Sequence, residues 1–386
     1  MPTRADVSRS ATFASIFAGG CWTRWDRARE TSIAREAQAL RPPRLPGTHV
    51  AMNPAATDDV AAAEREIAEF RRTYESLREA IARVIVGQRS VVEAALVTLF
   101  AGGHLLLEGA PGTGKTLLVR TLAKALELSF GRIQCTPDVM PADIVGTHWV
   151  AEEGGRREYR FRKGPVFANV VLADEVNRAT PKTQSALLEA MEERQVTVGG
   201  ETLRLPSPFL VLATENPIEM EGTYPLPEAQ LDRFLLKAMV PHPSAAEMET
   251  ILDRNAGSTI PSIGPILDGP RVLAMQALVR RVVLGDRVKS YVARLVEATR
   301  PDAPDPSAKV KRFVRFGASP RAALALVLAG KVAALAAGRG NIAREDVRAF
   351  AASALRHRLV LNFEAEAEGV TTEAILADLL EHVGAG

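Results

Sequence analysis

The chain has 386 residues, of which 47% are hydrophobic and 24% charged, so it is long enough for two domains of ordinary globular composition. The formal net charge is only +2, and a large nucleic-acid-binding surface is therefore not expected. The two cysteines, Cys21 and Cys135, are too few and too far apart for a disulfide framework or a zinc site, which fits a reducing cytoplasm.

Residues 1–55 differ from the rest of the chain. They contain arginine but no lysine, show weak periodicity and include a proline-rich stretch. We expect disorder here, or an over-extended translation start with Met52 as the true beginning. A secretion signal that begins with Arg4 and Arg9 is the alternative, although its apolar segment is short and rich in small residues.

Two helices are expected next. Residues 58–85 carry apolar side chains three and four positions apart, with acidic residues early and arginines late, as an amphipathic helix prefers. A second helix is predicted to begin after Gly87-Gln88.

Strands and helices then alternate. Short apolar runs without strict alternation are typical of parallel strands that are buried on both faces. Helical patterns separate several of these runs, notably 116–126 and 181–193, so a three-layer α/β sandwich is predicted. The five candidate strands are His104–Leu107, Leu128–Cys135, Val170–Ala173, Phe209–Thr214 and Phe234–Val240.

Two segments interrupt this alternation and predict β-hairpins. Residues 146–165 have aromatic and β-branched flanks around Gly154-Gly155, and residues 194–206 have the same design around Gly199-Gly200. Both hairpins are expected to protrude from the α/β core.

Beyond Pro241 the strand signal fades and the remaining segments predict helices, several of them opened by Ser, Thr or Asp. We therefore expect an α/β core over residues 56–240 and an all-helical domain over residues 241–386. The apolar run Ala322–Ala337 contains Lys331 and is predicted to be a buried helix, so no stable membrane insertion is expected.

A glycine-rich turn lies between a predicted strand and a predicted helix. Gly109-Ala-Pro-Gly112-Thr-Gly114-Lys115-Thr116 fits the pattern G-x-x-x-x-G-K-T, whose backbone N–H groups wrap a phosphate chain. The following helix adds the positive end of its dipole. Lys115 is predicted to reach the β- and γ-phosphates, and the Thr116 hydroxyl to bind Mg²⁺.

Polar residues end two further predicted strands. Asp174 is predicted to hold Mg²⁺, and Glu175 to polarise a water towards the γ-phosphate. Alternatively, this pair caps the next helix or is simply solvated. Asn216 can orient the attacking water, but an asparagine before a proline is equally typical of a turn.

Four motifs together resemble an AAA+ ATPase of the MoxR family, a group related to RavA-like and magnesium-chelatase subunits. They are "GAPGTGKT", "LADEVNRA", "TENP" and "LPEAQLDRF". The resemblance runs from Val84 to the C-terminal helices. It implies a P-loop core with a five-stranded parallel sheet and a helical lid, and the two hairpins match the family's helix-2 and pre-sensor insertions.

The resemblance also implies roles for single residues. Asn216 becomes the sensor-1 residue, and Arg233 becomes the arginine finger that enters the neighbouring subunit's site. Arg321, in "GASPRAAL", becomes sensor 2 and is expected to contact the γ-phosphate of its own subunit. Gly87-Gln88 would lie against adenine, mainly through the backbone. The role of Arg178, at the interface or in a local pair, stays open. The expected nucleotide-binding residues are Gly87, Gln88, Gly109, Ala110, Pro111, Gly112, Thr113, Gly114, Lys115, Thr116, Leu117 and Asp174.

By resemblance, the protein is a cytoplasmic ATPase that assembles with itself into a ring, most simply a hexamer, and uses ATP and Mg²⁺ to remodel or mature a client protein complex. Its usual partner would be a separate protein with a von Willebrand factor A domain. Three alternatives stay open: a magnesium-chelatase-type subunit, a nucleic-acid-linked AAA+ motor, and a nucleotide-binding scaffold that hardly hydrolyses ATP.

Overall fold

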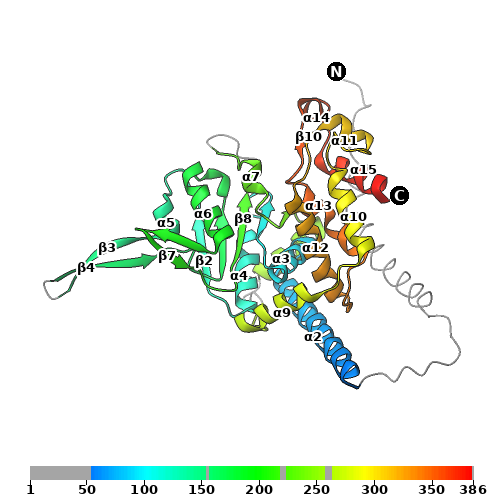
Figure 1. Ribbon diagram of the computed structural model, residues 1–386. Coiled ribbons are helices and arrows are strands. Elements are labelled where there is room, and N and C mark those ends of the chain that lie inside the picture. The colour runs from blue at the N-terminus through cyan, green and yellow to red at the C-terminus, as the bar shows by residue number, and fades with distance from the viewer. Residues whose placement is uncertain (1–53, 154–155, 218–222, 257–262, 385–386) are drawn as a thin grey trace. The chain divides into compact units, whose positions relative to one another are not determined.

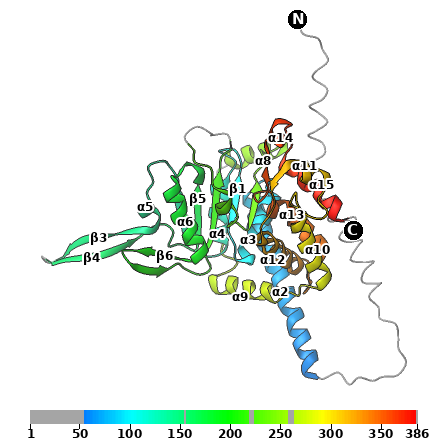
Figure 2. The ribbon, with the colours of Figure 1, turned by 45° about the horizontal axis from the view of Figure 1, so that its top comes forward.

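The computed structural model describes residues 54–153, 156–217, 223–256 and 263–384 (Figures 1 and 2). Almost all of the N-terminal extension, with Cys21 and Met52, lies outside these ranges. Residues from Val60 onward form one compact unit.

The centre of the fold is a parallel sheet of five strands in the order β2-β5-β8-β1-β9, which confirms the predicted sheet. Each predicted apolar run contains one strand. The bounds are β1 (Leu105–Glu108), β2 (Phe130–Gln134), β5 (Val170–Asp174), β8 (Leu210–Glu215) and β9 (Leu236–Met239).

Helices cover both faces of this sheet, so the three-layer sandwich is also confirmed. Alternate strand residues, such as Leu105 and Leu107, pack with α2 (Pro54–Val84), α3 (Arg89–Ala101) and α4 (Lys115–Ala125) in one apolar cluster. The residues between them, such as Leu106, pack with α6 (Pro181–Glu193) in a second cluster. Burial on both faces explains why the strands are uninterrupted apolar runs.

Both predicted hairpins are present. The first consists of β3 (Gly146–Glu153) and β4 (Arg156–Lys163), with its Gly154-Gly155 turn outside the described residues. The second consists of β6 (Gln195–Val198) and β7 (Glu201–Arg204). They lie side by side in both views, and a Cβ on Gly199 would come within 3.1 Å of the His148 ring (Figures 1 and 2).

The C-terminal part is helical, as predicted, with one departure. Its central helix α12 covers the run predicted to be buried and packs against its neighbours through small and branched side chains. A two-stranded antiparallel sheet, β10 (Val314–Phe316) with β11 (Val360–Leu361), was not predicted, because strands this short leave no periodic signal. The helices are α8 (Ala245–Ala256), α9 (Gly269–Arg281), α10 (Asp286–Glu297), α11 (Ala308–Phe313), α12 (Pro320–Ala336), α13 (Arg344–Leu355), α14 (Phe363–Ala367) and α15 (Thr372–Gly384).

The helical part is packed directly onto the core. The apolar cluster on the α3 face of the sheet continues without a break into α12 and α13. The division at residue 240 therefore stays a prediction. None of the described helices is long and apolar enough to span a bilayer.

Candidate nucleotide site

The glycine-rich turn connects β1 to α4 at the edge of the sheet where the parallel strands end, which we call the carboxyl edge. Gly112 and Gly114 have φ of 78° and 86°, a left-handed backbone that glycine adopts without strain. Gly109 is enclosed, because a Cβ there would lie 2.8 Å from both Val240 Cβ and the Val240 carbonyl oxygen. Its N–H donates to the Glu215 carbonyl (3.2 Å), so the turn is attached to β8 and packed against the end of β9.

The Lys115 ammonium is folded back onto this turn. Its Nζ donates to the carbonyls of Gly109 (2.5 Å) and Ala110 (3.2 Å). Burial lowers the pKa of Lys115, while the nearby carboxylates, Asp174 first, act in the opposite direction. A buried cation beside left-handed glycines is suited to an anionic ligand, and an oxygen-rich phosphate could replace the two carbonyls.

Asp174 and Glu175 lie at the same edge, at the end of β5. Asp174 is buried, and its carboxylate accepts from the Thr214 hydroxyl (2.9 Å) and from Arg132 (2.7 Å). The Thr214 oxygen also accepts from the Glu175 N–H (2.7 Å), so one hydroxyl orders both acidic residues. Both acidic residues are therefore ordered by hydrogen bonds within the fold, and their roles in catalysis and metal binding stay predictions.

The Glu175 carboxylate is held by two side chains from different elements. It accepts from Arg178 (3.2 Å) and from Gln134 Nε2 at the end of β2 (3.4 Å). Its own φ of 57° is left-handed, which is uncommon for a residue other than glycine and is often found at functional sites. Arg178 therefore makes the local pair, one of the two roles left open for it.

Asn216 is buried directly after β8, whose last residue lies opposite the last residue of β1. Its carbonyl accepts from Asn177 Nδ2 (3.4 Å). The carboxyl edge thus brings together the phosphate turn, Asp174, Glu175 and Asn216. Parallel strands end at a common edge, which is why segments distant in sequence meet here.

Sequence reasoning missed an ion cluster formed by Lys237 with Glu108 and Glu215, the last residues of β1 and β8. Lys237 Nζ, reaching from β9, is 2.5 Å from Glu108 Oε2 and 3.8 Å from Glu215 Oε2. Burial raises the pKa of Glu215, although Lys237 acts to lower it. Glu108 directly precedes the phosphate turn and Glu215 directly precedes Asn216. The cluster therefore connects the phosphate turn and Asn216 to β9.

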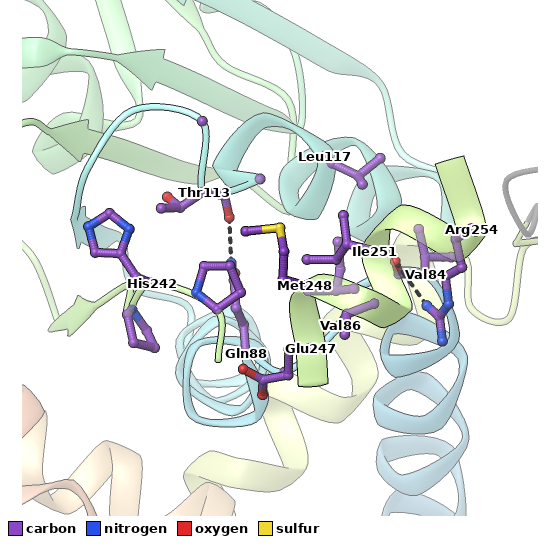
Figure 3. Close-up of a pocket in the computed structure, with 16 residues that line it drawn as sticks. Val84, Val86, Gln88, Thr113, Leu117, His242, Glu247, Met248, Ile251 and Arg254 are labelled. Atoms are coloured by element: carbon purple, nitrogen blue, oxygen red, sulfur yellow. Dashed lines mark hydrogen bonds between the residues drawn. The ribbon is translucent and has the colours of Figure 1, made fainter. Parts of the chain in front are cut away.

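A cavity of about 290 Å³ opens beside the phosphate turn (Figure 3). Its walls are mainly apolar, with Val86, Leu117, Met248 and Ile251 among the side chains that line it. An apolar pocket next to a phosphate site suits the base of a nucleotide.

Gln88 connects this pocket to the phosphate turn. Its Nε2 donates to the Thr113 carbonyl, the dashed contact near the centre of Figure 3. Its Oε1 is buried and finds no hydrogen-bond partner among the described residues. A base with an amino group would supply the missing donor. The Gln88 side chain therefore supports the turn, and the expectation that Gly87-Gln88 contacts adenine mainly through the backbone stays a prediction.

Arg233 and Arg321 lie at the opposite edge, where the strands begin, which we call the amino edge. Both line a hollow together with Gly103, His104 and Leu235, residues at the starts of β1 and β9. Glu192, near the end of α6, pairs with Arg233 (2.9 Å) through one oxygen and with Arg321 (2.6 Å) through the other.

This placement corrects the expectation for Arg321. The four residues of β1 span about 13 Å, which is longer than an arginine side chain. In this structure Arg321 therefore cannot contact a γ-phosphate on the turn of its own subunit. The sequence places Arg321 at the start of a helix, but it does not indicate which edge of the sheet that helix contacts.

Comparisons with known proteins agree with this geometry. Residues 104–236 match the ATPase family associated with various cellular activities (AAA), and residues 307–379 match the AAA lid domain. The chain is 45% identical to the chaperone MoxR1 of Mycobacterium tuberculosis over 88% of either protein. It is 30% identical to the protein MoxR of Methylorubrum extorquens, over 76% of this chain and 90% of that one.

A solved structure gives the same result. The crystal structure of a Cytophaga hutchinsonii protein assigned as an ATPase aligns with a TM-score of 0.78 and 39% identity, over 84% of this chain and 98% of that chain. Fold, motifs and relatives agree, and the chain belongs to the MoxR family of AAA+ ATPases.

Proposed function

We propose that this protein hydrolyses ATP at sites formed between head-to-tail copies of itself. The observation that carries this proposal is the separation of the two edges. The phosphate turn and the acidic residues lie at the carboxyl edge, while Arg233 and Arg321 lie at the amino edge. Each edge is incomplete alone, and a heterologous contact between two copies would complete one site.

The residues of the carboxyl edge would bind the nucleotide and position its attacking water. The turn from Gly109 to Thr116 would hold the phosphates, and the pocket of Figure 3 would hold adenine. Glu175, once released from Arg178 and Gln134, would accept a proton from water. Asn216 would orient that water.

The oxygen donors at this edge also fit a divalent cation. The Thr116 hydroxyl and the Asp174 carboxylate are hard ligands of the kind that Mg²⁺ prefers, and phosphate oxygens and water would complete its shell. Such a cation neutralises charge that develops on the phosphates. Thr214 and Arg132 hold the Asp174 carboxylate in place.

The arginines of the amino edge would act on the neighbour's γ-phosphate. The Arg233 and Arg321 side chains are 30% and 47% exposed, so both are accessible to a second copy. Arginine fingers of this kind accelerate hydrolysis by about 10³–10⁵-fold in GTPases.

The closed form of such an assembly is a ring, and a hexamer is the form that we propose. Its work would be the remodelling of a client protein complex in the cytoplasm, with a partner that carries a von Willebrand factor A domain. The name of the mycobacterial relative, a chaperone, supports this class of activity. The paired hairpins are the surface that would contact the client.

Mixing experiments test the shared site. Glu175→Gln and Arg233→Ala should each lower phosphate release by about 10³-fold alone. In a one-to-one mixture, about a quarter of the head-to-tail interfaces pair an intact carboxyl edge with an intact amino edge, so activity should return.

The matched control mixes Arg233→Ala with Arg321→Ala, which both damage the amino edge. That mixture should stay inactive. Recovery in this control, or none in the Glu175→Gln mixture, would contradict the proposal. Equal phosphate release by wild type and Glu175→Gln would instead identify a scaffold.

A further inference from the structure

A buried arginine from the helical part holds the segment that contains Arg233. Arg358 lies just beyond the end of α13, and its side chain is only 3% exposed. Its guanidinium donates to the Asp232 carboxylate (2.7 Å) and to the carbonyls of Asp232 (3.1 Å), Phe234 (2.8 Å) and Leu235 (3.3 Å). It also donates to the Ala354 carbonyl within its own part of the chain.

These contacts lie on both sides of Arg233. Residues 232 and 234 are bound by the same guanidinium, so the backbone between them has little freedom. The Arg233 side chain then runs to the Leu188 carbonyl (2.9 Å) and to Glu192 (2.9 Å). Arg358 thus fixes the position of the Arg233 backbone, and α6 fixes the position of the Arg233 guanidinium.

The same segment is connected to Arg321. The second oxygen of the Asp232 carboxylate accepts from the Ser319 hydroxyl (2.8 Å), and Ser319 caps the start of α12 two residues before Arg321. Asp232 therefore links Arg358 to Ser319. Arg233 directly follows Asp232, and Arg321 lies two residues after Ser319.

A simple packing role does not account for this arrangement. Burying a guanidinium is unfavourable, and apolar contacts can stabilise an interface equally well. Desolvation indeed acts to lower the pKa of Arg358, against the opposing effect of Asp232. What the planar guanidinium adds is fixed geometry towards several acceptors at once.

We propose that Arg358 is a positioning residue for Arg233, which fixes the finger to the lid so that Arg233 and Arg321 reach the neighbour's nucleotide together. This inference rests on the proposed shared site. Arg358 itself touches no nucleotide and acts through the Asp232–Leu235 backbone.

Arg358→Lys tests the proposal, because lysine keeps the charge but cannot bind several acceptors in one plane. The expected result is a fall in kcat of about 10²-fold, the effect of misplacing a catalytic group by about 1 Å. KM for ATP should stay within twofold, because the pocket of Figure 3 is untouched. Arg339→Lys is the control, since Arg339 pairs with Asp346 within the helical part (2.6 Å). Its kcat should remain that of wild type.

Complementation adds a readout that general loss of stability would not move. Arg358→Lys should regain activity when mixed with Glu175→Gln and should stay inactive when mixed with Arg233→Ala. Wild-type kcat, the opposite mixing pattern, or an equal loss in Arg339→Lys would overturn the proposal. Should Arg358→Lys fail to fold, Asp232→Asn replaces it, with a fall in kcat of about tenfold expected and an unchanged kcat refuting the idea.

Failure of this inference is distinguishable from failure of the proposed function. Full activity in Arg233→Ala would refute the shared site itself. An inactive Arg233→Ala beside a fully active Arg358→Lys would leave the shared site standing and remove only the role of Arg358.

Discussion

Replacing Lys237 by methionine should destabilise the protein in a pH-dependent manner. Glu108 and Glu215 lie opposite each other on neighbouring strands, and Lys237 is the cation between them. The three side chains are only 15–20% exposed. Methionine fills a similar volume but leaves two carboxylates facing each other.

The expected loss in the free energy of unfolding is about 3–5 kcal/mol at pH 8, the usual effect of removing one partner from a buried ion pair. Two carboxylates in one site cannot both stay ionised easily, so the pKa of one rises further. Burial already raises the pKa of Glu215 in the wild type. A raised folded pKa means that the folded state binds the extra proton, so the loss should shrink as the pH falls through that pKa.

Urea-induced unfolding followed by circular dichroism measures this effect at pH 8 and pH 5.5. Adding Glu215→Gln to Lys237→Met should restore most of the lost stability at pH 8, because it removes the repulsion. Lys289→Met, at an exposed position of α10, is the control and should change little. A loss below about 1 kcal/mol, or a loss of equal size at both pH values, would refute the reasoning.

Two further predictions concern buried groups of the core. Burial lowers the pKa of His104 to about 4, so the unfolded chain binds a proton that the folded state does not. Between pH 7 and pH 4 the free energy of unfolding of the wild type should fall by about 3 kcal/mol more than that of His104→Gln, measured by denaturant unfolding. The same pH dependence in both proteins would contradict this. Burial also raises the pKa of Cys135 to about 12. In a Cys21→Ser background, iodoacetamide at pH 8 should label the native protein about 10³-fold more slowly than the unfolded chain, whereas equal rates would show the thiol to be accessible.

The sheet and the phosphate turn could be predicted because their signals are local. A strand covered on both faces must be an apolar run, as Val170–Asp174 is, and a turn that binds phosphate needs glycine at fixed spacing. The paired glycines likewise marked the β6–β7 hairpin.

What the sequence did not indicate depends on contacts between distant segments. Lys237 acquires its role only when β9 lies beside β1, and Arg358 only when its guanidinium meets Asp232, 126 residues away. The edge that Arg321 occupies is set by how α12 packs on the core. No local pattern encodes that packing.

The lack of room for a side chain between Gly199 and the His148 ring has a mechanical consequence. The β3–β4 hairpin leads into β5, which ends in Asp174, and the β6–β7 hairpin leads into β8, which precedes Asn216. Because the two hairpins lie side by side, a displacement of either one would be passed to the other and so to both strands. A displacement of one hairpin would therefore act at two points of the carboxyl edge, and a bulkier residue in place of Gly199 would push the two hairpins apart.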